Sequence, residues 1–395
     1  MSCTHPGRTR YRFFGRNRTT TDPARSISPR SPHAGTDVAA PPQAASSRGS
    51  RFGLMRTPSA RSIRAAVASA LAVVTVLSIG GCSSDEEDAD DISVEPRPPA
   101  ESPEATVTPA GSVSAFAPVD ALTFDPATRT LVALTDASTT VTLVRDGATA
   151  ETRVVDLGST GAELVAGRDS TVLVPMDGAV ARIAVADGQR TDLTVDADAL
   201  SAADLPDGTT AVGDDTGAVR VLDTNGQVTA TVSGGSVTSA DSLASTPNGV
   251  SVLDRRQTSV TDLDLDDGTL GVALRAGEGA AEMTSDEFGR LLVTDSTGTE
   301  LLVFTSHDLL MRQRFPVGSQ PWAIAYDEQS GVAWVTLPAL NEVVGYTLDT
   351  GIPVEARRLA TVRQPNSVAV DADTGDLYVG SATGDGLQRI PAAGR

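Results

Sequence analysis

The chain has 395 residues, of which 40% are hydrophobic and only 4% aromatic, with 36 Gly and 23 Pro. This composition is typical of a soluble, β-rich protein with many turns, and it excludes a polytopic membrane protein. All 31 basic residues are Arg, so mechanisms that need a lysine amine are excluded as well.

The formal charge of −20 is distributed unevenly along the chain. Residues 1–81 hold 12 Arg and two acids, so the remainder holds 31 − 12 = 19 Arg and 51 − 2 = 49 acids, a balance of −30. Such a surface repels the phosphates of nucleic acids and the headgroups of anionic lipids. We therefore expect no nucleic-acid partner.

Residues 1–54 are rich in Arg, Ser, Pro and Gly and show no apolar periodicity. They are either disordered or an upstream extension from a misassigned start. Met55 stands directly before Arg56 and would be a natural initiator, which favours the second interpretation.

Residues 55–81 have the pattern of a secretory signal. Arg56, Arg61 and Arg64 precede an uncharged run, residues 65–79, which is shorter than the ~20 residues of a comfortable membrane span. The ending Ile79-Gly80-Gly81-Cys82 resembles the lipobox of bacterial lipoproteins. The resemblance implies that Cys82 is acylated and holds the protein at the cell membrane, facing outside the cytoplasm. An ordinary cleaved signal or an uncleaved anchor is the alternative.

Residues 82–110 combine acids with Pro and lack an apolar face, so we expect an extended tether that acts as a spacer. Calcium binding or protein docking by its acidic run is the alternative. The only other Cys is Cys3, so the part of the chain after the signal can form no internal disulfide.

A period of about 40 residues runs through residues 111–395. A short β-branched motif recurs, and its sixth residue falls at Asp136, Met176, Asp214, Asp254, Asp295, Leu337 and Ser381. Seven copies at this period predict an all-β fold, a seven-bladed β-propeller of four-stranded antiparallel blades.

Each copy contains further strand and turn signals. Alternating third strands are expected at residues 141–144, 179–185, 219–222, 260–265, 301–304, 343–348 and 387–390. Turn dipeptides such as Asp146-Gly147 and Asn225-Gly226 follow most of them, and a more polar fourth strand is expected at the outer edge. The last copy ends after its third strand, so we predict that residues 112–116 supply its fourth strand and close the ring.

The last two copies carry the clearest motifs, Trp334-Val335-Thr336 and Tyr378-Val379-Gly380, each after a Gln-Pro pair and an Asp-x-x-x-Gly turn. These motifs resemble the YVTN and NHL repeat classes of β-propeller, among them the YncE-like proteins. The resemblance implies the fold and says little about function, because the architecture hosts enzymes, sensors and scaffolds.

Few reactive side chains are available after the signal. Its single His, His307, is expected on a surface turn, and with no Lys and no Cys beyond Cys82 the usual nucleophile pairs and histidine metal sites lack their parts. Asp371 to Asp376 resembles a calcium loop but lacks the downstream Glu, so an ordinary turn is favoured.

The residues that begin the inner strands should ring the channel mouth. We predict ligand-binding residues there at Asp120, Glu163, Asp241, Trp322 and Asn366. The equivalent positions in the remaining copies are near Asp204 and at Ala281 or Glu282. Converging carboxylates raise one another's pKa or hold a cation such as calcium, although an electronegative entrance without a ligand explains them too.

We therefore expect a monomeric, lipid-anchored, extracytoplasmic propeller of an actinobacterial envelope, which binds an envelope protein, a glycan or a small ligand without catalysis. No catalytic residue and no obligatory cofactor are predicted. The alternative is a metal-dependent hydrolase of the lactonase type, similar to the gluconolactonase-like propellers. A third interpretation is a scaffold that works through the side of the ring and the acidic tether.

Overall fold

Antiparallel strands form nearly all the regular structure in the computed structural model, which describes residues 93–145 and 151–392. The segment 1–54, the signal 55–81, Cys82 and the turn Asp146-Gly147 lie outside the described residues. Within the described part, no helix is both long and apolar enough to span a membrane.

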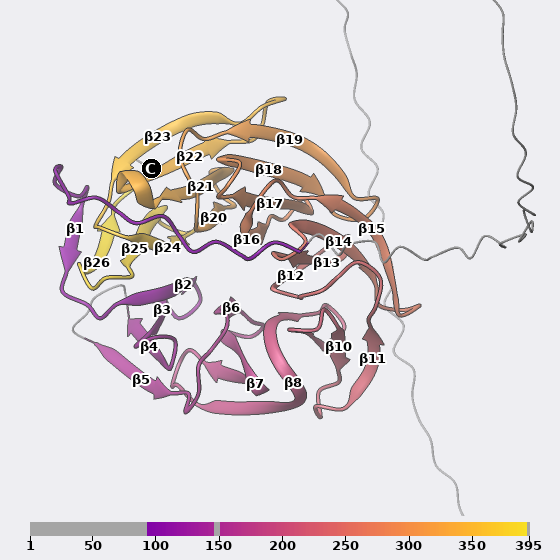
Figure 1. Ribbon diagram of the computed structural model, residues 1–395. Coiled ribbons are helices and arrows are strands. Elements are labelled where there is room, and N and C mark those ends of the chain that lie inside the picture. The colour runs from indigo at the N-terminus through magenta and orange to yellow at the C-terminus, as the bar shows by residue number, and fades with distance from the viewer. Residues whose placement is uncertain (1–92, 146–150, 393–395) are drawn as a thin grey trace, which may run out of the picture. The chain divides into compact units, whose positions relative to one another are not determined.

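The strands form six sheets around a central axis (Figure 1). Four of these sheets contain four consecutive strands each: β2 (Val119–Asp125), β3 (Thr130–Thr135), β4 (Thr140–Arg145), β5 (Thr152–Asp156); β12 (Ser242–Thr246), β13 (Gly249–Asp254), β14 (Ser259–Asp264), β15 (Thr269–Arg275); β16 (Ala280–Ser285), β17 (Arg290–Asp295), β18 (Glu300–Thr305), β19 (Leu310–Pro316); β20 (Ile324–Asp327), β21 (Val332–Leu337), β22 (Glu342–Thr347), β23 (Val354–Ala360). A single 3-10 turn, Pro338–Leu340, joins β21 to β22.

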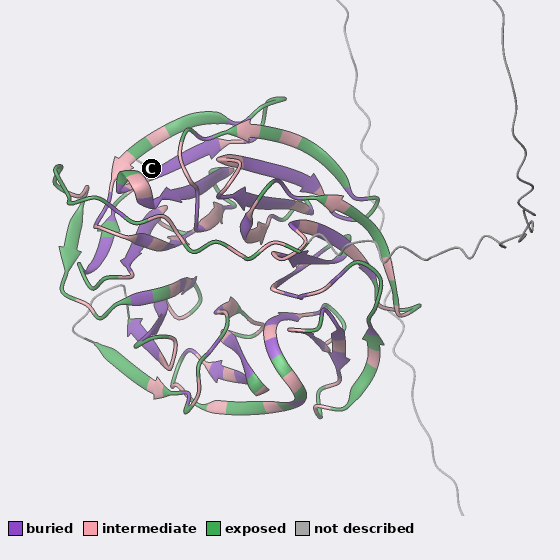
Figure 2. Cartoon of the chain, viewed as in Figure 1, coloured by how far each residue is buried: buried purple, intermediate pink, exposed green. Residues whose placement is uncertain are grey.

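In each of these four sheets the first strand lies nearest the axis and the fourth lies at the rim (Figure 1). The second strands are almost fully buried, as in β3 and β21, whereas the outer strands β15 and β19 are largely exposed (Figure 2). This gradient confirms the predicted polar fourth strand, because only the rim strand has a face in water. The motif Trp334-Val335-Thr336 lies in buried β21, so it serves packing between sheets.

The prediction of seven separate four-stranded blades is wrong in residues 165–232. These residues form one six-stranded sheet: β6 (Val165–Ala166), β7 (Thr171–Ala184), β8 (Arg190–Asp204), β9 (Thr210–Asp214), β10 (Val219–Leu222) and β11 (Val228–Val232). The repeat period assigns this stretch to two copies. The copies merge because β7 and β8, at 14 and 15 residues, continue through register shifts near Gly178 and between Ala199 and Ser201 instead of ending in turns.

The sixth sheet confirms the predicted closure of the ring. It contains β24 (Pro365–Asp371), β25 (Asp376–Ser381), β26 (Leu387–Ile390) and, at its outer edge, β1 (Ser112–Ser114). Ser112 pairs with Arg389 and Ser114 with Leu387 in antiparallel register. Phe124 and Tyr378 stack across the junction of the first and last sheets, with ring centroids 5.5 Å apart.

Residues 94–110, here called the strap, run across the disc in front of β16, β20 and β24 (Figure 1). The N–H of Val94 donates to Arg256 O over 2.7 Å, and that of Ala110 donates to Ala360 O over 2.9 Å. Between these ends, buried Ser102 donates from Oγ to Pro338 O over 2.6 Å and accepts from the N–H of Gln364 over 2.9 Å.

The strap is extended, as its Pro residues predict, but it is not the free spacer that the sequence suggested. Its backbone groups find partners in loops of the ring, so this part of the acidic segment belongs to the folded unit. It crosses the face at which the inner strands begin, because Arg256, Pro338 and Gln364 lie in loops that precede inner strands or follow second strands.

Candidate ligand-binding site in the central cavity

The inner strands enclose a cavity of about 620 Å³. Seven segments line it, from β2, β6, the end of β8, β12, β16, β20 and β24. The six-stranded sheet contributes two of these segments. The cavity therefore has seven inner segments, one for each sequence repeat, although the strands form only six sheets. The volume lies within the range of about 300–1,000 Å³ that is usual for small-molecule sites.

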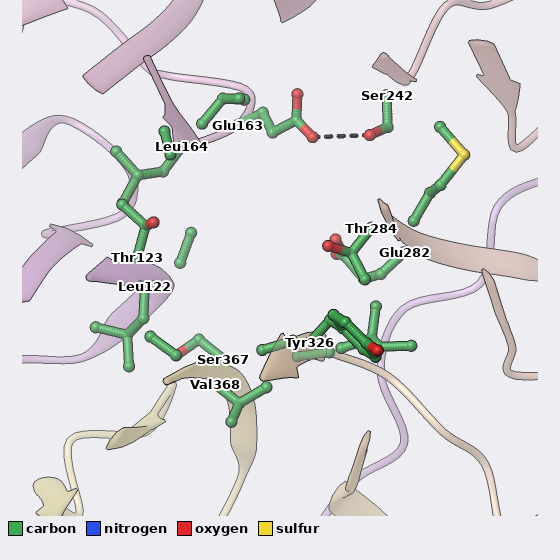
Figure 3. A pocket seen from close by; sticks show the side chains of 18 of the residues that line it. Leu122, Thr123, Glu163, Leu164, Ser242, Glu282, Thr284, Tyr326, Ser367 and Val368 are labelled. Carbon is green, nitrogen blue, oxygen red and sulfur yellow. Dashed lines mark hydrogen bonds between the residues drawn. The ribbon is translucent and has the colours of Figure 1, made fainter. Parts of the chain in front are cut away.

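Glu163 points into this cavity from the segment before β6 (Figure 3). Its Oε1 accepts a hydrogen bond from the hydroxyl of Ser242 over 2.9 Å. Its Oε2 is shielded from solvent and has no partner. Burial, followed by repulsion from Glu282 and Asp241, raises the pKa of Glu163 to about 8, although the Ser242 hydrogen bond opposes the shift.

Glu282 enters the same cavity from β16 (Figure 3). Burial raises its pKa, and the charge of Arg255 partly opposes the shift. Its backbone N–H donates to Thr294 Oγ1 over 3.1 Å, which fixes the strand and leaves the carboxyl group facing the cavity. Two carboxyl groups with raised pKa therefore share one space.

Asp241 and Trp322 do not line the cavity but flank its mouth. Arg255 joins them: its N–H donates to Asp241 Oδ2 over 2.8 Å, and its guanidinium lies 5.4 Å from the centroid of the Trp322 ring. Burial raises the pKa of Asp241 against the opposing hydrogen bond from Arg255. Trp322 is 9% exposed, so its predicted role as an open stacking surface is wrong: Arg255 already lies over its ring.

Asp120 and Asn366 do line the cavity, as predicted, but both are engaged. Asp120 Oδ2 accepts the N–H of Ser138 over 2.8 Å. Asn366 Oδ1 accepts from Gln364 Nε2 over 3.0 Å, and the same amide donates to Ala100 O of the strap over 2.8 Å. The strap thus connects to the mouth through Gln364.

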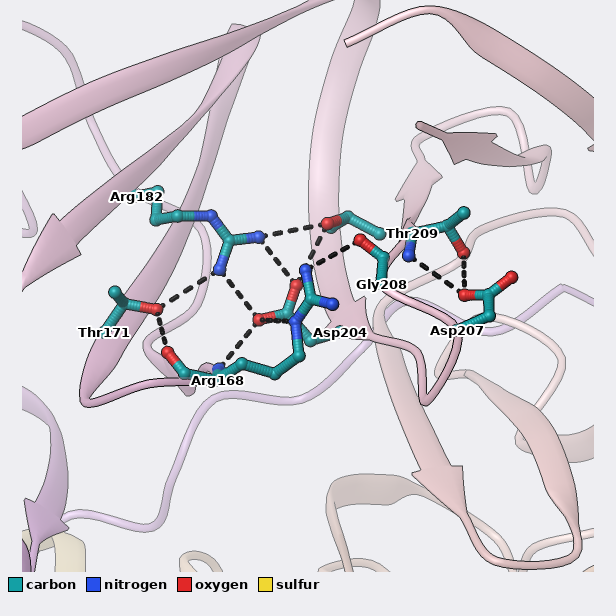
Figure 4. A network of polar contacts seen from close by, with 8 residues as sticks. Arg168, Thr171, Arg182, Asp204, Asp207, Gly208 and Thr209 are labelled. Carbon is teal, nitrogen blue, oxygen red and sulfur yellow. Dashed lines mark hydrogen bonds and ion pairs between the residues drawn. The ribbon is translucent and has the colours of Figure 1, made fainter. Parts of the chain in front are cut away.

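Asp204 lines the cavity, but from the end of β8 and not from the start of an inner strand, so its predicted place at the mouth is wrong. The merged strand β8 shifts the alignment there. Asp204 instead forms a polar network with Arg182 and Arg168 (Figure 4). Burial would raise its pKa, but hydrogen bonds from Arg182 at 2.6 and 2.8 Å and from the N–H of Arg168 lower it to about 2.

We expect Asp204→Asn to lower the free energy of unfolding at pH 7 by about 2 kcal/mol, because each pKa unit is worth about 1.4 kcal/mol. A carboxyl group with a lowered pKa stabilises the fold at pH values above its ordinary pKa. This stabilisation is lost as the pH falls toward about 2. Urea unfolding at pH 7 and pH 3 checks it: the variant should lose less stability between the two than the wild type. Asp207→Asn, in the exposed turn of Figure 4, is the control and should change little; equal slopes for wild type and Asp204→Asn would contradict the assignment.

The remaining sequence candidates have structural roles. Asp371 is buried, accepts hydrogen bonds from the N–H of Asp373 and the hydroxyl of Thr374, and so forms the ordinary turn that was favoured over a calcium loop. His307 is exposed in the turn between β18 and β19, as predicted.

A metal centre of the lactonase type does not fit the described residues. In residues 93–145 and 151–392, no three His, Cys, Asp or Glu side chains come close enough to hold a metal ion. A hard divalent cation takes six or more oxygen ligands, several of them usually carboxylates. Glu163 and Glu282 supply two.

Sequence reasoning left the β16 position undecided between Ala281 and Glu282, and it missed Arg255. Strand alternation could have chosen Glu282, since Ala281 packs into the core between sheets. Arg255 carried no signal, because it lies in a turn far from Asp241 and Trp322 in the repeat alignment.

No protein-family model matches the sequence, and no curated protein matches it. Solved structures do resemble the fold. Hydrazine synthase from Kuenenia stuttgartiensis matches with a TM-score of 0.59 and 14% identity, over 73% of this chain and 99% of that one. A streptogramin B lyase gives 0.56 and 11%, over 72% and 94%, and the Cps50 (Swd1) propeller domain from "Myceliophteria_thermophila" gives 0.58 and 11%, over 71% and 99%. At these identities the likeness shows a β-propeller fold and nothing more.

Proposed function

We propose that this protein is a lipid-anchored, extracytoplasmic binding module of the cell envelope that takes a small ligand into its central cavity without chemical conversion. The cavity of about 620 Å³ carries the proposal. Its lining combines apolar side chains and hydroxyl groups with two convergent carboxyl groups of raised pKa, which suits a small-molecule site. Of the envelope protein, glycan and small ligand considered from the sequence, the small ligand fits an internal cavity best.

The proposed location depends on the sequence before the ring. The signal-like residues 55–81 and the lipobox-like ending at Cys82 support export and lipidation. From Cys82 to Val94, where the strap begins, the chain can reach about 40 Å at most. A lipid at Cys82 would thus keep the ring close to the membrane. The motifs of β21 and β25 further support membership of the YVTN and NHL repeat classes.

The location is tested by labelling with an alkyne analogue of palmitate in a bacterial host that processes lipoproteins. We expect the full chain to incorporate the label and to fractionate with membranes, whereas Cys82→Ser should do neither. Label on Cys82→Ser, or none on the wild type, would reject the anchor.

Binding in the cavity is tested by saturation-transfer NMR on the full chain carrying Cys82→Ser, with a fixed panel of small amines, alcohols, sugars and carboxylates. Ala325 lines the cavity, and Ala325→Trp should fill it and abolish the signals of cavity ligands. Ala273→Trp places the same side chain on exposed β15 and should preserve them. Signals that survive in Ala325→Trp, or a panel without any signal, would reject cavity binding.

A further inference from the structure

Glu163 and Glu282 face one cavity without a cation of their own. The groups that act most strongly on Glu163 include two acids, Glu282 and Asp241, and no base. Arg255 is the basic group that acts on Glu282 and Asp241, and its guanidinium lies over Trp322 outside the cavity lining. The mouth therefore holds three carboxyl groups and only one guanidinium, so negative charge exceeds positive charge there.

Glu163 shows the deficit most directly. Its Oε2 is buried and has no hydrogen-bond partner, while its Oε1 is held in place by Ser242. A buried polar atom without a partner costs free energy, which a ligand donor would recover. The unpaired oxygen is independent of the mere clustering of acids. Once Glu163 is ionised this oxygen is an acceptor, so a ligand with N–H donors and positive charge would both pair with it and favour the ionised form.

The rest of the cavity lining is mixed. Leu122, Leu164 and Val368 give it apolar surface, and Ser242 and Thr284 add hydroxyl groups next to the acids (Figure 3). The apolar side chains can pack against an alkyl or aryl body, and the hydroxyl groups can accept further hydrogen bonds from its charged head. In the described residues no three His, Cys, Asp or Glu side chains come close enough to hold a metal ion, whereas an ammonium group on a hydrocarbon body can use the two carboxylates and the apolar side chains.

We propose that the central cavity binds an organic ammonium ion, with its charged head between the carboxylates of Glu163 and Glu282 and its apolar body against Leu122, Leu164 and Val368. The proposal rests on the cavity-binding function above and adds the class of ligand. Charge-assisted hydrogen bonds to two carboxylates would hold the head, and they are stronger in a shielded site than at the surface.

The experiment compares four probes by titration calorimetry on the full chain carrying Cys82→Ser: n-hexylammonium, 1-hexanol, hexanoate and calcium chloride. The three organic probes share an alkyl body and differ in charge. We expect hexylammonium to bind at least about tenfold more tightly than hexanol, which corresponds to one good charge-assisted interaction, and hexanoate not to bind.

Titrations at pH 7 in phosphate and in Tris provide a second readout. The free protein holds a proton on Glu163, whose pKa is about 8, and an ammonium ion requires the carboxylate. Binding should therefore release up to one proton per ligand, visible as a difference between the enthalpies measured in the two buffers. Hexanol should release none.

Glu163→Gln and Glu282→Gln should each remove the preference for hexylammonium over hexanol, and Glu163→Gln should also remove the proton release. Glu287→Gln is the matched control, because Glu287 is an exposed acid in the turn after β16 that does not line the cavity, and it should retain both. Binding of 1-hexanol by both Gln variants shows that they still fold.

Equal affinities for hexylammonium and hexanol would overturn the ammonium site. They would leave the cavity-binding proposal intact, because that proposal is tested separately by Ala325→Trp. Tight calcium binding that Glu163→Gln abolishes, without a preference for hexylammonium, would overturn it in favour of a metal ion. No heat from any of the four probes would overturn it as well.

Discussion

Asp295→Ala is expected to lower the free energy of unfolding by about 4 kcal/mol, because each buried donor left without a partner costs about 1–3 kcal/mol. Asp295 ends β17 and is fully buried. Its Oδ1 accepts the N–H groups of Gly279 and Gly298 over 2.9 and 2.8 Å, and its Oδ2 accepts the N–H of Glu278 over 2.8 Å. One carboxylate therefore fastens the loop before β16 to the turn after β17.

Glycines on both sides provide the space that the Asp295 carboxylate occupies. A Cβ atom at Gly298 would lie 2.1 Å from Asp295 Oδ2, and one at Gly277 would lie 2.0 Å away. Asp295→Ala would therefore leave a space between these loops and three backbone N–H groups without their acceptor.

Urea unfolding, followed by circular dichroism, measures the effect of Asp295→Ala. Asp295→Asn keeps one oxygen acceptor and should lose about half as much. Glu287→Ala changes an exposed acid of the neighbouring turn and should stay within about 0.5 kcal/mol of the wild type. A loss below about 1 kcal/mol for Asp295→Ala would show that water satisfies these loops after all.

The second large effect is a fall in wild-type stability as the pH rises from 5 to 9. A carboxyl group whose folded pKa is raised to about 8 binds a proton in the native state that the unfolded state releases near 4.5, so native stability decreases with pH between the two values. The full shift would be worth about 5 kcal/mol at about 1.4 kcal/mol per unit. Because Glu163 is partly exposed to the cavity, we expect about 2–3 kcal/mol.

Glu163→Gln should remove most of this fall and should be more stable than the wild type at pH 9. Glu282 also has a raised pKa, so the double variant with Glu282→Gln should give a flatter profile than either single variant. Thermal or urea unfolding at pH 5, 7 and 9 measures the slopes. The lowered pKa of Asp204 acts at the acidic end of the range and leaves this window unaffected. A wild-type profile that rises or stays level between pH 5 and 9 would contradict the burial of Glu163.

The sequence predicted most of the architecture because each strand obeys a local rule. Hairpin turns and alternating residues define β12 to β26 within a few residues, and the missing fourth strand of the last copy identified β1 as its partner. The same reasoning failed where turn signals are weak. Met176 to Gly178 was interpreted as the end of one strand, but β7 passes through it with a bulge.

The site was predictable only in part. Glu163, Asp120 and Asn366 were placed at the cavity because the start of an inner strand points toward the axis. Whether such a residue is free or engaged depends on loops distant in sequence. Arg255 covers Trp322, Ser138 holds Asp120, and Gln364 connects Asn366 to the strap.

The sequence by itself determined a ring of antiparallel sheets closed by an N-terminal strand, because hydrophobic alternation and turn residues are local properties. Only the tertiary structure decided which acids meet. It brought Glu163 and Glu282 into the same cavity, paired Asp204 with Arg182, and placed the strap across the mouth. A pKa near 8 arises from burial and a neighbouring charge, and both exist only once segments more than 100 residues apart enclose the same cavity.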